Sequence, residues 1–174
     1  ALCLATPFRA QKLDLSDALL AAGVENLFQG LANNKGLRNL DMTNTGVGVK
    51  ASETIAACLK TDDIMEVLNL SSNQVRNHGC KQIADMLGEN ATIRKLDLSF
   101  NMISAIGVNS IVEGVKAREG ISRYDVSEMK ALELDIVLVG NLFGKDPGSV
   151  DESQLIVQPK LARCKLVFDN ASKD

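Results

Sequence analysis

The chain is poor in the residues on which most enzymes, metal centres and nucleic-acid-binding surfaces depend. It has no tryptophan, one tyrosine and one histidine, and 3% of its 174 residues are aromatic. We therefore expect an aliphatic core, which suits stacked repeats better than an aromatic-filled sandwich. The formal charge is -3, and lysine and arginine form no cluster, so no nucleic-acid partner is expected.

Cysteine and glycine are too scattered for the sites that they usually form. Cys3, Cys58, Cys80 and Cys164 have neither zinc nor redox-pair spacing. Cys58 and Cys80 fit as small core residues, and free thiols of this kind are typical of a reducing compartment, so we expect a cytoplasmic protein. There is no phosphate loop or calcium loop, and the composition and the short opening segment argue against a membrane span. We predict no metal, no cofactor and no membrane partner.

Apolar residues make up 45% of the chain, and they recur at a fixed period. Segment 93–115 reads I-R-K-L-D-L-S-F-N-M-I-S-A-I-G-V-N-S-I-V-E-G-V, and most of its apolar positions reappear 28 residues earlier in segment 65–87. Two looser copies precede these, with strands around Leu13 and Leu40. Each copy joins an alternating strand, a turn and a helix with apolar residues at helical spacing. Self-similarity at one period predicts a solenoid of strand–helix units.

The expected fold class is therefore α/β. Units too small to bury their own apolar faces stack, with parallel strands side by side and helices in a second layer. Because strands are narrower than helices, the array should bend into a right-handed superhelix, with the sheet on its concave face and the helices on its convex face. We count four units and a fifth strand at 121–126, so that the array covers residues 10–127 after a lead-in at 1–9.

The repeat pattern stops after residue 127. Residues 134–139 predict another strand with no room for a helix before it, so we interpret 128–143 as a terminal hairpin or cap over the open edge of the sheet. Glycine, proline and charged residues gather from residue 144 onward. Segment 144–174 is thus expected to be a linker followed by a cap extension or a tail.

A single asparagine stands where the chain leaves each of two strands. The amides of Asn73 and Asn101 should satisfy buried backbone groups, which cost roughly 1–3 kcal/mol each when unpaired. Thr45 and Ala18 occupy this place in the earlier units and cannot make all of the same bonds. Looser turns are expected there.

The outward positions of the strands are the candidate binding surface. Between the inward-facing leucines we expect an acidic row, a hydroxyl row beside it and basic residues at both ends. Such rows orient a partner by charge, or they are merely solvated. Phe100 breaks the polar pattern, either as a hot spot for a partner or as a side chain that leans on its neighbours. The predicted partner-binding residues are Asp41, Asn69, Lys95, Asp97, Ser99, Phe100, Arg123 and Asp125.

The pattern L-x-x-L-x-L-x-x-N-x-I-x-x-x-G-x-x-x-I-x-x-x-V at a period of 28 resembles the leucine-rich repeat in its long, ribonuclease-inhibitor-like class. That class also occurs in tropomodulin, Ran GTPase-activating protein and the NOD-like receptors. The resemblance covers about two thirds of the chain. Segment 84–96 is particularly similar to tropomodulin repeats, whereas the residues after 126 are not. The motif encodes the core and implies little about function.

These features favour a non-enzymatic protein–protein interaction module that binds a protein partner through the concave sheet face. His78 is the only histidine, and it falls at the start of a helix, where we interpret it as exposed and incidental. One alternative is a cytoskeletal protein that caps actin filament ends as tropomodulin does, or a scaffold within a larger assembly. Another alternative is a regulator of a small GTPase.

Overall fold

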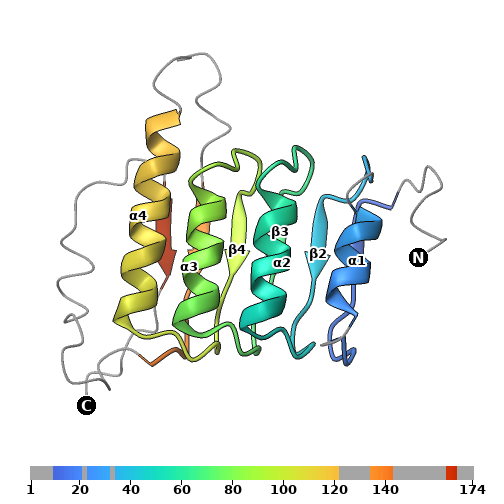
Figure 1. The fold of residues 1–174 in the computed structure, drawn as a ribbon, viewed down its shortest axis with the longest axis horizontal. Coiled ribbons are helices and arrows are strands. Elements are labelled where there is room, and N and C mark those ends of the chain that lie inside the picture. Colours follow the sequence, from blue (N-terminus) through green and yellow to red (C-terminus); the bar gives the residue numbers. More distant parts are fainter. Residues whose placement is uncertain (1–9, 21–22, 32–33, 122–133, 143–163, 168–174) are drawn as a thin grey trace.

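The computed structural model describes residues 10–20, 23–31, 34–121, 134–142 and 164–167. Within these residues the chain is an α/β solenoid with six strands in one parallel sheet, ordered β1 to β6, and a row of helices on one face (Figure 1). The strands are β1 (Lys12–Asp14), β2 (Asn39–Asp41), β3 (Val67–Asn69), β4 (Lys95–Asp97), β5 (Leu134–Val137) and β6 (Cys164–Val167). The helices are α1 (Val24–Leu31), α2 (Val49–Leu59), α3 (Arg76–Leu87) and α4 (Ala105–Ile121).

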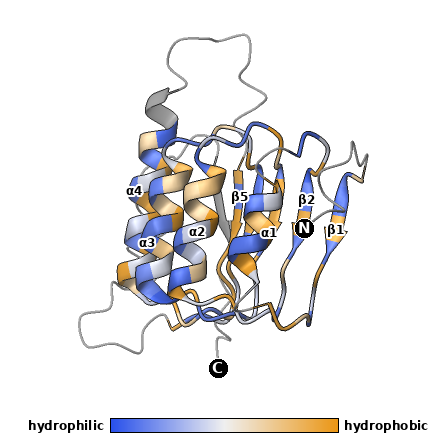
Figure 2. Ribbon diagram, turned by 45° about the vertical axis from the view of Figure 1, so that its right-hand side comes forward, coloured by the Kyte–Doolittle hydropathy of each residue, from blue (hydrophilic) through white to orange (hydrophobic). Residues whose placement is uncertain are grey.

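The core lies between the sheet and the helices, as the alternating pattern predicts. One residue at the same register in each of β2 to β5 points inward; Leu40, Leu68, Leu96 and Ile136 pair in register and are at most 1% exposed. Figure 2 shows hydrophilic colour on either side of the hydrophobic centre of β1, and hydrophobic residues on the helices that cover the sheet. We number the units by their strand, so unit 3 is β3 with α3. The helices add one large residue each from equivalent positions, namely Phe28, Ile55, Ile83 and Ile111.

The predicted place of a fifth strand, beside β4 at residues 121–126, is wrong. Ile121 ends the long helix α4, and the residues after it, 122–133, lie outside the described residues. The neighbour of β4 in the sheet is β5, where Ile136 stands beside Leu96. A terminal hairpin is also wrong for this segment, because β5 is parallel to β4, and β6 is parallel to β5. The connection between units 4 and 5 is simply longer than the others, so a fixed period of 28 missed the next unit.

A recognisable signal for unit 5 was present in the sequence. Ile136, Leu138 and Asn141 repeat the spacing of Leu96, Leu98 and Asn101, 40 residues further on. The strand predicted at 134–139 is therefore a further unit of the array. The lead-in predicted at 1–9 and the linker predicted from 144 lie outside the described residues, apart from β6.

Asparagine at the strand exit fulfils its predicted role, and its contacts run between units. Asn73 in unit 3 accepts hydrogen bonds from the backbone amides of Thr45 and Val47 in unit 2, at 3.1 and 2.9 Å. Its Nδ2 donates to the Met42 carbonyl of unit 2 at 2.8 Å. The Thr45 hydroxyl donates to the same carbonyl at 2.8 Å, and Thr45 is 0% exposed. The turn at Thr45 is thus closed, contrary to expectation, because unit 3 supplies what it lacks.

Asn141 extends this arrangement into unit 5. Its Oδ1 accepts from the amides of Asn101 and Ile103 at 2.9 and 3.0 Å. Its Nδ2 donates to the carbonyls of Leu98 and Leu138, both at 2.9 Å. Unit 5 therefore supports the turn of unit 4 in the same way that unit 3 supports the turn of unit 2.

A second polar row closes the opposite ends of the units, where each helix returns to the sheet. Oδ1 of each of Asn34, Asp62 and Asn90 accepts two hydrogen bonds, from the backbone amides of the second and third residues after it, at 2.6–2.9 Å. Arg118 holds the equivalent place in unit 4, where its guanidinium donates to the carbonyls of Asn90 and Ile93 at 2.7 and 2.6 Å. The signal for this row is an Asn or Asp three residues before the first apolar residue of each strand segment.

Candidate functional site: the concave sheet face

The outer face of the sheet forms a groove of about 330 Å³ across β1 to β4. The side chains at its rim come from the first and third residues of each strand, because these alternate with the buried middle residue. The groove is lined by Lys12, Leu13, Asp14, Asn39, Leu40, Asp41, Val67, Leu68, Asn69, Lys95 and Asp97.

The acidic row shapes the strand exits as well as the surface. Oδ1 of Asp14, Asp41 and Asp97 accepts the backbone amide two residues further on, at 2.9 Å in each case. Asn69 makes the same bond at 3.0 Å. These are Asx turns, which explains why an acid or an amide recurs at this place in units 1 to 4. A partner would therefore meet the second oxygen of each carboxylate.

The second carboxylate oxygens differ along the row. Oδ2 of Asp41 accepts a hydrogen bond from Nδ2 of Asn69 at 3.0 Å. In the described part of the chain, no hydrogen bond reaches Oδ2 of Asp14 or of Asp97. Hydrogen bonds from the hydroxyl and the amide of Ser16 lower the pKa of Asp14, which keeps that carboxylate ionised. At the two ends of the row, Oδ2 of Asp14 and Oδ2 of Asp97 can therefore each accept a hydrogen bond from a partner. Lys12 and Lys95 are exposed on the same strands.

The hydroxyl row is mostly engaged within the protein. Oγ1 of Thr43 lies 2.6 Å from Oδ1 of Asp41 and 3.1 Å from Oγ of Ser71. Ser99 is only 5% exposed, so it is a poor contact residue despite its predicted place in the site. The structure brings Asp41, Asn69, Lys95 and Asp97 together on one face and leaves Ser99 largely covered.

The row changes character at unit 5. Asp135 stands beside Lys95, and Val137 stands beside Asp97. The predicted places of Arg123 and Asp125 next to these residues are therefore wrong, and both residues lie outside the described residues. The error follows directly from the fixed period, which placed the fifth strand too early. The acidic row consequently gives way to a valine at β5.

Phe100 lies at the border between the acidic row and unit 5. It has a φ of 55°, in the left-handed region, as do Asp17, Asn44 and Ser72 at the same place in the earlier units. Its ring rests on Gly140, because a Cβ added to Gly140 would come within 2.2 Å of the ring carbon Cε1. Even so, the residue is 57% exposed. The ring thus leans on a neighbour and still exposes apolar surface, and its role as a hot spot for a partner stays a prediction.

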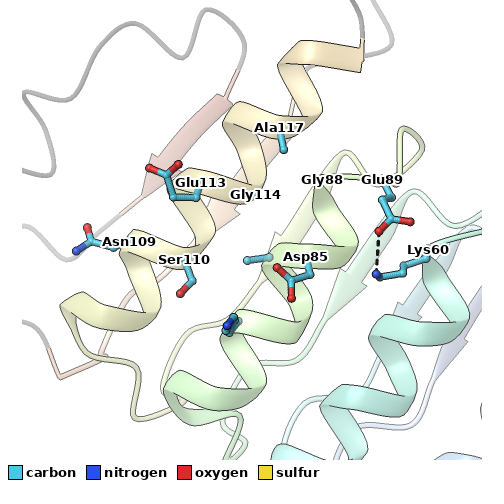
Figure 3. A pocket seen from close by; sticks show the side chains of 11 residues that line it. Lys60, Asp85, Gly88, Glu89, Asn109, Ser110, Glu113, Gly114 and Ala117 are labelled. Carbon is cyan, nitrogen blue, oxygen red and sulfur yellow. Dashed lines mark hydrogen bonds and ion pairs between the residues drawn. The ribbon is translucent and has the colours of Figure 1, made fainter.

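A second hollow, of about 620 Å³, lies on the helix side between α3 and α4 (Figure 3). The two helices that flank it pack very closely, since a Cβ on Gly114 would lie 2.2 Å from the Ala84 carbonyl oxygen. At its edge Lys60 donates to Glu89 at 2.8 Å, and this bond raises the pKa of Lys60. Its charges are mixed and largely exposed, which is typical of a solvated helix surface.

Among the described residues, no group of three or more His, Cys, Asp or Glu side chains lies close enough to hold a metal ion. His78 is exposed at the start of α3, as expected from its position. None of the described helices combines the length and the hydropathy that crossing a bilayer requires.

The fold and the face define a class: a solenoid of parallel strand–helix units with asparagine at the strand exits. The Leucine Rich repeat family matches residues 65–84 and 89–112, which are units 3 and 4. RAN GTPase-activating protein 2 of Arabidopsis thaliana is 29% identical over 118 residues, covering 66% of this chain and 22% of that protein. Mouse ribonuclease inhibitor is 29% identical over 100 residues, covering 57% of this chain and 22% of the inhibitor. Units 3 and 4 are leucine-rich repeats, and the solenoid has the fold of the ribonuclease-inhibitor-like class.

A solved structure supports the fold over more of the chain. Leiomodin-1 Actin-Binding Site 2 superposes with a TM-score of 0.66, covering 88% of this chain and 79% of that chain, at 18% sequence identity. At that identity the likeness speaks for the fold alone. The chain spans about a fifth of the plant and mouse relatives, whose whole-protein activities are therefore no guide by themselves.

Proposed function

We propose that this chain is a protein-interaction module that binds a protein partner through its concave sheet face. The observation that carries the proposal is the polar groove across β1 to β4, with outward acceptor oxygens on Asp14 and Asp97. A repeat that encodes its core in fixed positions leaves such outward positions free to vary with the partner. Carboxylates flanked by lysines suit a partner with basic and hydrogen-bonding groups, because complementary charge orients the encounter and speeds association.

The test uses substitutions that keep the Asx turns intact. Asn69 already makes the turn with an amide, so Asp41→Asn and Asp97→Asn should both keep the turns. Asp97→Asn removes only charge, whereas Asp41→Asn also removes the acceptor of the hydrogen bond from Nδ2 of Asn69. Partners captured from the native source by the wild-type chain should be lost or weakened with the double variant, and association rates of the purified pair should fall. Asp85→Asn, on α3, is the matched control. If the double variant captures the same partner and associates with it at the same rate as the wild-type chain, the proposal is refuted.

Phe100 is proposed as the apolar contact beside this face. Phe100→Ser places at this position the residue that unit 3 carries in the same left-handed conformation, at Ser72, so the turn should form normally. We expect the captured partner to bind about 2 kcal/mol more weakly, the loss typical of a central aromatic contact. Unchanged affinity would remove Phe100 from the site.

A second candidate function is regulation of a small GTPase, supported by the similarity to RAN GTPase-activating protein 2 over 118 residues. The test is GTP hydrolysis by purified Ran with and without this chain. Actin co-sedimentation and pointed-end elongation test the cytoskeletal alternative in the same preparation. No acceleration of hydrolysis and no effect on actin would leave the interaction module, which we place in the cytoplasm, as the surviving candidate.

A further inference from the structure

The turn edge of the solenoid, where strands end and helices begin, changes chemistry between units 3 and 4. Three outward positions there carry polar side chains in unit 3 and large apolar side chains in unit 4, at a constant offset of 28 residues. Unit 2 has no large apolar residue at these places either. The matched pairs are Ser72 with Phe100, Gln74 with Met102, and His78 with Ile106.

These apolar residues remain exposed in the fold. Phe100 is 57% exposed, Met102 49% and Ile106 69%. Leu142 joins them at 37% exposure, since its backbone amide donates to the Ile103 carbonyl at 2.8 Å and so holds it against the same turn. We call these four residues the turn-edge patch. Several large apolar side chains gathered at one edge, with polar equivalents one unit away, mark an interaction surface rather than an incidental exposure.

The backbone of this turn is held in a costly shape. Phe100 and Met102 both have positive φ, at 55° and 57°, a region that residues with a Cβ seldom occupy. Asn141 fixes the turn by accepting the amides of Asn101 and Ile103. The patch is therefore presented on a rigid support, which suits binding without prior ordering.

The charge around the turn-edge patch selects the kind of partner. The backbone amide of Arg76 donates to the Asn101 carbonyl at 3.0 Å, which places Arg76 beside the turn that carries Phe100 and Met102. Arg76 and Lys50 are exposed, and the ion pairs found among the described residues involve neither of them. No acidic residue lies in the first turn of α2, α3 or α4, and the helix N-termini add partial positive charge.

We propose that the turn-edge patch docks an acidic, apolar segment of a partner protein. Its apolar side chains cover Phe100, Met102 and Ile106, and a neighbouring carboxylate pairs with Arg76. This surface goes beyond the concave face of the proposed function and shares only Phe100 with it. The two surfaces also call for opposite charge in the partner, which makes them separable by experiment.

The test selects ligands from a phage-displayed library of random dodecapeptides on the wild-type chain, with counter-selection on Met102→Gln/Ile106→His. Those substitutions are the unit 3 residues, so circular dichroism should show an unchanged fold. The selected peptides should combine Leu or Phe with Asp or Glu. The best synthetic peptide should lose about tenfold or more in affinity on the double variant and on Arg76→Gln, and stay within about twofold on Leu19→Gln and on Asp41→Asn/Asp97→Asn.

Several results would overturn the proposal. The proposal fails if the selected peptides are rich in Lys and Arg, or if no peptide binds the wild-type chain in preference to the double variant. It also fails if Arg76→Gln leaves the affinity of the selected peptide unchanged. If the double variant fails to fold, Arg76→Gln alone decides. Phe100→p-benzoylphenylalanine then identifies the occupant on irradiation: cross-linking to the selected peptide supports the proposal. A covalent dimer, or a cross-link within one chain in the presence of that peptide, would instead assign the patch to a second copy or to the chain itself.

Discussion

Replacing Asn73 and Asn101 by alanine should have unequal effects, although the two residues occupy the same place in successive repeats. Without Asn73, the amides of Thr45 and Val47 lose the acceptor that each has in the fold. Without Asn101, only the amide of Val75 loses its acceptor. The carbonyl oxygens that either side chain serves keep other donors: Met42 keeps the Thr45 hydroxyl, and Leu70 keeps whichever asparagine remains.

The magnitudes follow from the number of amides left unpaired. A buried donor without a partner costs roughly 1–3 kcal/mol, so Asn73→Ala should lower the free energy of unfolding by about 2–6 kcal/mol and Asn101→Ala by about 1–3 kcal/mol. In a chain of this size the melting temperature falls by roughly 2–4 °C per kcal/mol. Burial alone predicts the opposite order, because Asn101 is 0% exposed and Asn73 is 4% exposed.

The assay is urea denaturation followed by far-ultraviolet circular dichroism, since the chain has no tryptophan to report unfolding. Native-state hydrogen exchange should show the Thr45 and Val47 amides losing protection in Asn73→Ala. Asn109→Ala, at an exposed position on α4, is the control and should stay within about 0.5 kcal/mol of wild type. Equal destabilisation by Asn73→Ala and Asn101→Ala, or a larger loss from Asn101→Ala, would refute the reasoning.

Three further predictions concern packing and protonation. Gly114→Ala should cost about 1–3 kcal/mol or more by thermal melting, because its Cβ would meet the Ala84 carbonyl, and an unchanged melting temperature would contradict the close approach of α3 and α4. Ser16→Ala should raise the pKa of Asp14 in a carbon-13 NMR titration. Because the pKa of Asp14 is lower in the folded state, its ionised form stabilises the fold at a pH above the unfolded pKa, and this stabilisation is lost as the pH falls through the folded pKa. Burial raises the pKa of the Cys80 thiol to about 12, so iodoacetamide at pH 8 should label it only on unfolding, as peptide mass spectrometry would show.

The sequence predicted those features that depend on a regular spacing. The strands of units 1 to 4, their inward residues and the role of Asn73 and Asn101 follow from alternation and a period of 28, because each is fixed by local geometry. Unit 5 was missed because the connection after α4 is longer, although Ile136, Leu138 and Asn141 preserve the spacing within the unit.

The candidate site was harder to predict than the fold, for a related reason. Which outward residues are neighbours depends on sheet register, and the error at β5 replaced Asp135 and Val137 by Arg123 and Asp125. Whether an outward side chain can contact a binding partner depends on how neighbouring residues cover it, and Ser99 is only 5% exposed. No pattern in one chain records those side-chain contacts.

The hydrogen bonds that the strand-exit asparagines accept from turn amides all run the same way along the chain. Asn73 serves the turn of unit 2, Asn101 that of unit 3 and Asn141 that of unit 4, so each turn depends on the unit that follows it. Loss of a unit from the far end would strip the preceding turn of its support, whereas loss of unit 1 would deprive no later turn of these bonds. Through these asparagine bonds, the loss of a unit therefore destabilises the turn before it and leaves the turn after it unaffected.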